Sequence, residues 1–213
     1  MIFARAARRG WLAGRGPTVA VDGTGLETRH ISAHYRGTRR RGGQRGRPRA
    51  RYPTLTVAIH TASHLIAGAV TGTGPAPEFA AFAPVMRQAV ALMPRIAALV
   101  ADAGFDAEAV HRLCRGPLGI RRTAIRLNPR RRRRQWPATR YRRAMRRRFP
   151  RRLYRRRQQV ESVFSQTKRR LGSALTARSE ATQRAESILR VLTHNLMLLR
   201  RIHLSIQQSR SDP

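Results

Sequence analysis

The chain has 213 residues, a formal net charge of +35 and a hydrophobic content of 41%. This length and apolar content allow one buried core. The charge means that the protein must interact with polyanions. Nucleic acid is the obvious partner, and an anionic membrane is the weaker alternative. The single cysteine, Cys114, excludes a disulfide framework and a paired-cysteine metal site.

Residue alternation, turn residues and helical spacing predict a series of strands and helices. In chain order these are a strand at 17–22, a hairpin of strands at 55–61 and 65–71, a helix at 78–93, a strand at 96–101, a helix at 107–114, a strand at 120–127, a helix that begins at Pro150 and a last helix at about 181–206. This order resembles that of a ribonuclease-H-like domain. We therefore predict an α/β fold with a mixed sheet flanked by helices.

The last predicted helix carries large apolar residues at helical spacing. They are Ile188, Leu192, Leu196, Leu199 and Ile202. Because this spacing places them on one side of a helix, we expect that side to close the core.

Acidic residues are scarce, with ten Asp and Glu in the whole chain. Asp22 and Asp102 each follow a predicted strand, and Glu161 lies on the helix that begins at Pro150. Each has an ordinary interpretation, as a turn residue, a helix cap or a member of a solvated helix face, and Asp106 competes with Asp102. Three carboxylates that converge can hold a pair of Mg²⁺ ions, which prefer oxygen ligands. We therefore predict a metal site at these three residues.

Four side chains on the Glu161 helix share one stripe. Tyr154, Arg157, Glu161 and Lys168 are separated by offsets of three, seven and fourteen residues from the first. At about 100° per residue, they lie within roughly 60° of one another around the axis. Lys168 is the only lysine in the chain. A phenol, a guanidinium, a carboxylate and an ammonium on one surface suit a site that handles phosphate and a divalent metal.

An arginine-rich insertion precedes this helix. Residues 121–160 contain no acidic residue, and the densest run is Arg130, Arg131, Arg132, Arg133 and Arg134. We expect this run to contact DNA phosphates without reading base sequence. Trp136 and Tyr141 lie among the arginines and could stack on bases or serve as packing anchors.

These motifs resemble a known family. The spacing Y-(2)-R-(3)-E-(6)-K from Tyr154 to Lys168 is similar to the signature of bacterial insertion-sequence transposases of the DDE type. The stretches VDGTGLETRH around Asp22 and LVADAGFDAE around Asp102 resemble the two aspartate motifs of that family, and LTHNLMLLRR resembles its closing helix. The resemblance covers residues 18–203.

The resemblance implies metal-dependent cutting of DNA strands and their transfer to a target. Asp22, Asp102 and Glu161 would bind Mg²⁺, for which Mn²⁺ would substitute. Tyr154, Arg157 and Lys168 would position phosphates near the cut site. The partner would be double-stranded DNA, both element ends and target, on which the protein would act as a homo-oligomer.

The expected organisation is a basic segment at 1–16, a catalytic domain at 17–206 and a tail at 207–213. No apolar stretch of signal-peptide length occurs before Asp22, so we expect a cytoplasmic bacterial protein that joins the nucleoid when bound to DNA. Because relatives usually carry an N-terminal recognition domain, we expect a truncated copy, a fragment of a split reading frame or a decayed element. Two alternatives stay open, namely a non-enzymatic basic nucleic-acid-binding protein and a hydrolytic nuclease of the same fold.

Overall fold

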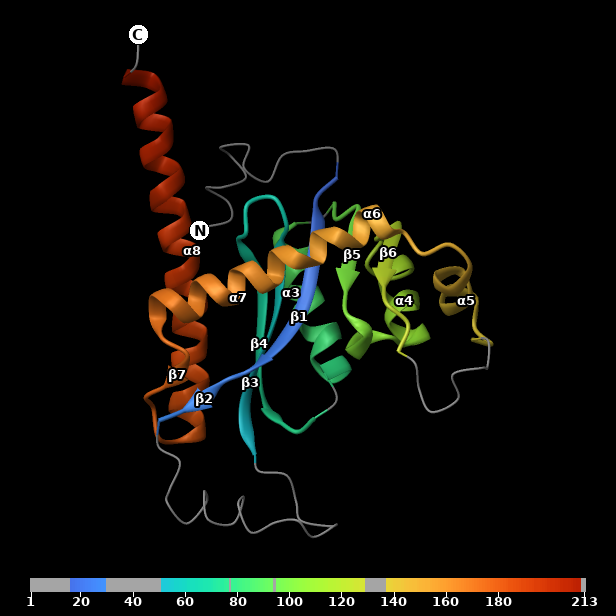
Figure 1. The fold of residues 1–213 in the computed structure, drawn as a ribbon, viewed down its shortest axis with the longest axis horizontal. Helices are drawn as coiled ribbons and strands as arrows, with labels where there is room; N and C mark the ends of the chain where they lie inside the picture. Colours follow the sequence, from blue (N-terminus) through green and yellow to red (C-terminus); the bar gives the residue numbers. More distant parts are fainter. Residues whose placement is uncertain (1–15, 30–50, 77, 94, 129–136, 212–213) are drawn as a thin grey trace.

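The computed structural model describes residues 16–29, 51–76, 78–93, 95–128 and 137–211, the last ten of these as helical backbone only. Their centre is a five-stranded sheet with the order β4-β3-β1-β5-β6 (Figure 1). The strands are β1 (Thr18–Gly25), β3 (Tyr52–His60), β4 (Ile66–Gly74), β5 (Ala98–Ala101) and β6 (Arg122–Ile125). Strand β3 runs antiparallel to β1 and β4, while β1, β5 and β6 are parallel. This arrangement confirms the predicted ribonuclease-H-like α/β fold.

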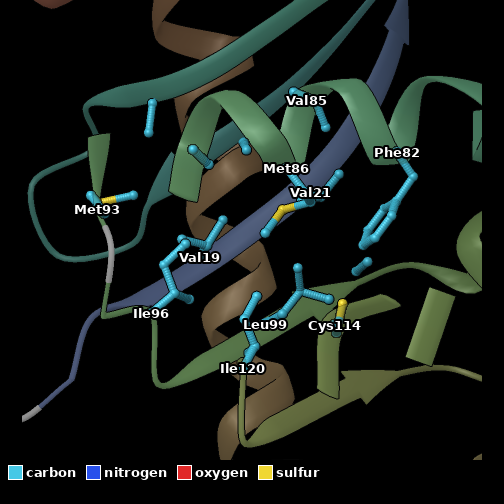
Figure 2. Close-up of a cluster of buried hydrophobic side chains, with 14 of the residues drawn as sticks. Val19, Val21, Phe82, Val85, Met86, Met93, Ile96, Leu99, Cys114 and Ile120 are labelled. Carbon is cyan, nitrogen blue, oxygen red and sulfur yellow. The ribbon is translucent and has the colours of Figure 1, made fainter. Parts of the chain in front are cut away.

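Alternation along β1 places its side chains in two separate cores. Val19 and Val21 face one core and Ala20 faces the other. The first core packs under α3 (Phe82–Leu92), which follows the 3-10 turn η1 (Glu78–Ala81), and under η2 (Ala103–Phe105) and α4 (Glu108–Arg115). Figure 2 shows its centre, where Met86, Leu99 and other apolar side chains meet. Both faces of the central strand are therefore buried, which fixes the position of its end.

The second core lies under the helices that carry the sequence signature. They are α6 (Arg151–Tyr154), the 3-10 turn η3 (Arg155–Arg157) and α7 (Gln158–Leu171), which follow α5 (Arg140–Arg147). Leu153, Val160 and Val163 are their buried anchors. Figure 1 shows α6 and α7 crossing the sheet in one line, with α5 beyond the β6 edge. The expected single helix is thus interrupted by one 3-10 turn.

A small parallel ladder, which the sequence did not predict, ties the end of α7 back to the sheet. It joins β2 (Glu27–Thr28) to β7 (Ala174–Leu175). The backbone N–H of Arg29 also donates to the carbonyl of Leu175 at 2.9 Å. The predicted hairpin is confirmed as β3 and β4, and the other predicted elements are present with ends that shift by a few residues.

The predicted packing face of the last helix, α8 (Glu180–Ser211), was wrong. Ile188, Leu192 and Leu196 are 44%, 43% and 50% exposed, although Leu199 does pack against the core. The side chain of Ile202 lies outside the described residues. The face that meets the sheet carries buried Val191, His194, Asn195 and Leu198.

The reason for this difference lies in the edge strand β4. An edge strand exposes backbone donors and acceptors that need partners when they are buried. The Asn195 amide supplies both, because it donates to the carbonyl of Ile66 and accepts from its N–H, each at 2.9 Å. The imidazole of His194 contacts the carbonyl of His64 at 3.2 Å. The packing face of α8 therefore combines polar contacts to this edge with the buried side chains of Val191 and Leu198, and apolar spacing alone does not reveal it.

Candidate active site

Asp22 lies on the central strand, one residue beyond the parallel ladder with β5, which ends at the Val21–Ala101 pair. Its side chain is 13% exposed. One carboxylate oxygen accepts from the backbone N–H of Gly23 at 2.9 Å, and the other accepts from the Arg157 guanidinium at 3.0 Å. The carboxylate is thus held in place but keeps an open side.

Asp102 follows the adjacent strand, β5, and begins the η2 turn. Its carboxylate accepts from the backbone N–H of Gly104 at 2.7 Å, which is an N-capping contact. Because β1 and β5 are parallel neighbours, the residues after them meet at the same edge of the sheet. Asp22 and Asp102 therefore lie on the same side of the fold, as the sequence predicted.

Asp106, the competing candidate, is engaged elsewhere. Its side chain is fully buried and pairs with Arg142 through two hydrogen bonds of 2.8 Å. It also accepts from the backbone N–H of Asn128 at 2.9 Å. These contacts fix α5 to the turn after β5, so Asp106 is a structural residue.

Glu161 stands in the first turn of α7 with its side chain 53% exposed. Its carboxylate accepts from the same Arg157 guanidinium that bonds Asp22. Arg157 therefore bridges two of the three predicted carboxylates. This bridge brings the sheet edge and the helix face together.

The electrostatics of Asp22 link all of these groups. Burial raises the pKa of Asp22 to about 6, and the N–H of Gly23 partly offsets this rise. The charges of Asp102 and Glu161 also raise this pKa, whereas Arg157 lowers it. Burial lowers the pKa of Arg157, but the negative charges of Asp22 and Glu161 outweigh this effect, so the pKa of Arg157 is raised overall. The three carboxylates thus share one electrostatic neighbourhood, in which Arg157 is the described cation that opposes the rise in the pKa of Asp22.

The other signature residues border this neighbourhood. The Lys168 ammonium donates to the hydroxyl of Thr24, two residues beyond Asp22, at 3.3 Å. The ring of Tyr154 packs edge-on against Phe149, with centroids 5.0 Å apart. Both side chains are half-buried.

Arg156 makes a contact that the sequence did not predict. Its guanidinium donates to the hydroxyl of Thr18, at the start of β1, at 2.7 Å. Together with Arg157 it fixes η3 over the central strand. One arginine among many neighbouring arginines gave no signal for this role.

The five arginines predicted to bind DNA, Arg130 to Arg134, lie outside the described residues, as does Trp136. Tyr141 is described, and it packs within the protein. Its ring stacks on His111, with centroids 5.9 Å apart and an interplanar angle of 26°. The guanidinium carbons of Arg115 and Arg140 lie 5.0 and 5.5 Å from its centroid. Of the two interpretations, packing anchor is the one that these contacts support.

The comparison with protein families decides the wider assignment, because a transposase DDE domain matches residues 13–196. The chain belongs to the transposase DDE domain family. The match runs from before β1 into α8, so it includes all three predicted carboxylates. A search of curated proteins found no match. The family indicates a phosphoryl-transfer enzyme of DNA, and its members generally use divalent metal ions.

The residues at the site fit such an ion by their chemistry, since all three predicted ligands supply carboxylate oxygens. Their present arrangement is not a closed ligand set. Within the described part of the chain, no three His, Cys, Asp or Glu side chains are grouped closely enough to hold a metal ion. Arg157 takes the place of a cation between Asp22 and Glu161.

In the ranges that the structure describes, no helix combines the length and the apolar character needed to cross a bilayer.

Proposed function

We propose that residues 17–206 are the catalytic domain of an insertion-sequence transposase that cuts DNA strands and joins them to a target, with Asp22, Asp102 and Glu161 as its catalytic carboxylates. The observation that supports this most is the Arg157 bridge, which draws carboxylates from a strand end and a helix onto one cation. Asp102 belongs to the same electrostatic group. Family membership supports the reaction class.

The proposed chemistry is two displacements at phosphorus. In the first, a water oxygen bonds to the phosphorus at the element end while the bond from phosphorus to the 3′ oxygen breaks, which frees a 3′ hydroxyl. In the second, this 3′ hydroxyl bonds to a target phosphorus and displaces the target's own 3′ oxygen. When bound, divalent ions supply positive charge to the attacking and leaving oxygens in such reactions.

The protein's own residues would supply ligands and orientation. Asp22, Asp102 and Glu161 would hold the ions. Once released from the two carboxylates, the Arg157 guanidinium could grip a phosphate with two hydrogen bonds, whereas Lys168 would act as a point charge near Thr24. The half-buried Tyr154 would border the same phosphate. Rigid supports favour this role, because η3 is tied to β1 by Arg156.

A cleavage and joining assay tests the proposal. Supercoiled plasmid is incubated with the protein and Mg²⁺ or Mn²⁺, and nicked, linear and joined products are separated. We expect metal-dependent products that disappear in Glu161→Gln, which keeps the size of the side chain but removes its charge. Glu180→Gln is the matched control, since Glu180 also pairs with an arginine four residues away but lies on α8. Nicking without joining would favour the hydrolytic nuclease, and binding without cutting would favour the non-enzymatic protein.

A further inference from the structure

An open groove lies between α5, α6 and β6, and arginine side chains dominate its lining. Its volume is about 840 Å³. Six exposed arginines line it, which are Arg115, Arg122, Arg140, Arg143, Arg147 and Arg148. They come from the end of α4, the start of β6 and most of α5. With Leu153 of α6, the lining therefore draws on four separate elements of the fold.

The charge of this groove is not neutralised within the described residues. None of the six arginines forms a salt bridge with a described acidic residue. The two carboxylates that contact α5 are engaged with other groups. Asp106 pairs with Arg142, and Glu108 accepts from the backbone N–H groups of Tyr141 and Arg142 at 3.2 Å. Because guanidinium groups stay protonated, six of them around one groove repel each other until an anion binds.

The groove is also held rigidly. Met145 and Leu153 are buried and anchor α5 and α6 at its floor. Tyr141 holds the guanidinium groups of Arg115 and Arg140 close to its ring without removing their charge. The cost of ordering these long side chains is thus partly met before a ligand arrives.

The lining favours the phosphate backbone over the bases. Among the residues that the structure describes, its lining includes no aromatic side chain, and the nearby Tyr141 ring is already covered by His111 and by guanidinium groups. Single-stranded nucleic acids are usually gripped by stacking their bases on free aromatic rings. A duplex, by contrast, presents phosphates to arginines without any stacking.

We infer that this groove binds the phosphodiester backbone of duplex DNA. Pro150 and Leu153 line the groove, and Tyr154, the next residue, begins the signature that leads through η3 to Glu161. The groove therefore adjoins the start of the helical segment that carries Glu161. The inference rests on the proposed function for the position of the cut, but not for the binding itself.

The test is a duplex-binding titration of the full chain in EDTA, where metal-dependent cutting does not take place. The variant Arg122→Gln, Arg147→Gln, Arg148→Gln removes three groove charges at exposed positions. The control Arg87→Gln, Arg200→Gln, Arg201→Gln removes three exposed charges from α3 and α8. Fluorescence anisotropy against salt concentration gives affinity and salt slope for a short labelled duplex. Circular dichroism confirms that both variants are folded.

The groove variant should bind on the order of 10- to 100-fold more weakly, and its slope of log affinity against log salt should fall by about 2 to 3, because each phosphate contact contributes about 0.9. The control should change the slope by less than about 1. Equal losses in both variants, or no loss in the groove variant, would overturn the inference. A loss confined to a single-stranded probe, or competition by inorganic tripolyphosphate alone, would also overturn it. A failure of the proposed function would appear instead as absent cutting with these binding results intact.

Discussion

Two Asp–Arg pairs in this protein use the same chemical groups for different purposes. Asp106 and Arg142 form a closed pair in which the carboxylate is fully buried and joined by two parallel hydrogen bonds. Asp22 accepts only one hydrogen bond from Arg157, whose other terminal nitrogen donates to Glu161. The first pair satisfies both partners and locks α5 in position. The second joins two carboxylates through one guanidinium and leaves the Glu161 side chain 53% exposed, as the proposed catalytic role requires.

The closed pair should carry the larger share of stability. Replacing Asp106 by Ala leaves Arg142 without its partner and releases the contact with Asn128, and breaking a buried pair costs about 3 kcal/mol or more. We therefore expect the free energy of unfolding to fall by about that amount, measured by urea denaturation. Asp102→Ala is the control and should cost much less. If both variants lost equal stability, the structural distinction between these two aspartates would be wrong.

The open pair should behave in the opposite way. Ionised Asp22 is disfavoured by burial, which raises its pKa to about 6. Asp22→Asn keeps the hydrogen bond from Gly23 and removes the charge, so at pH 7.5 we expect the free energy of unfolding to rise by about 1 kcal/mol. Urea denaturation measures the difference from the wild type.

The stability difference between Asp22→Asn and the wild type should depend on pH. Between the ordinary pKa of 3.8 and the raised value of about 6, the folded state binds more protons at Asp22 than the unfolded state does. The stability of the wild type therefore falls as pH rises through this window. The advantage of Asp22→Asn should be full above pH 6 and should vanish as pH falls toward 4. An advantage that grew on acidification would contradict this account.

An exposed Arg–Glu pair should contribute the least to stability of the ion pairs compared. Glu180 and Arg184 are paired on α8, with side chains 58% and 56% exposed. Solvent screens such pairs, so Glu180→Gln should leave the denaturation midpoint within experimental error. A clear loss would mean that surface pairs matter more here than burial suggests.

The sequence predicted the sheet and the positions of Asp22, Asp102 and Glu161 because these follow from local patterns. The turn residues after the first predicted strand placed Asp22 at its end, and the spacing from Tyr154 to Lys168 placed four side chains on one stripe of a helix. The choice between Asp102 and Asp106 depended on where α5 docks, since Arg142 comes from 36 residues further along the chain. No local pattern carries that information.

The same limit explains what the sequence did not predict. The packing face of α8 includes Asn195, which bonds to the backbone of Ile66 across 129 residues. The bridge by Arg157 joins a strand to a helix across 135 residues. The arginine groove arises only when α4, α5 and β6 are brought together, although its arginines were visible as composition. In each case the missing step was a long-range contact of a polar side chain.

Binding of Mn²⁺, followed through the electron paramagnetic resonance signal of the free ion, tests the central claim most directly. Asp22→Asn removes a proposed ligand and should weaken binding on the order of 10-fold or more. Arg157→Gln removes the competing cation and should tighten binding several-fold, with Arg157→Lys between this variant and the wild type. Glu180→Gln should match the wild type. If Mn²⁺ affinity were the same in Asp22→Asn, Arg157→Gln and the wild type, the three carboxylates would not be the metal site of this transposase domain.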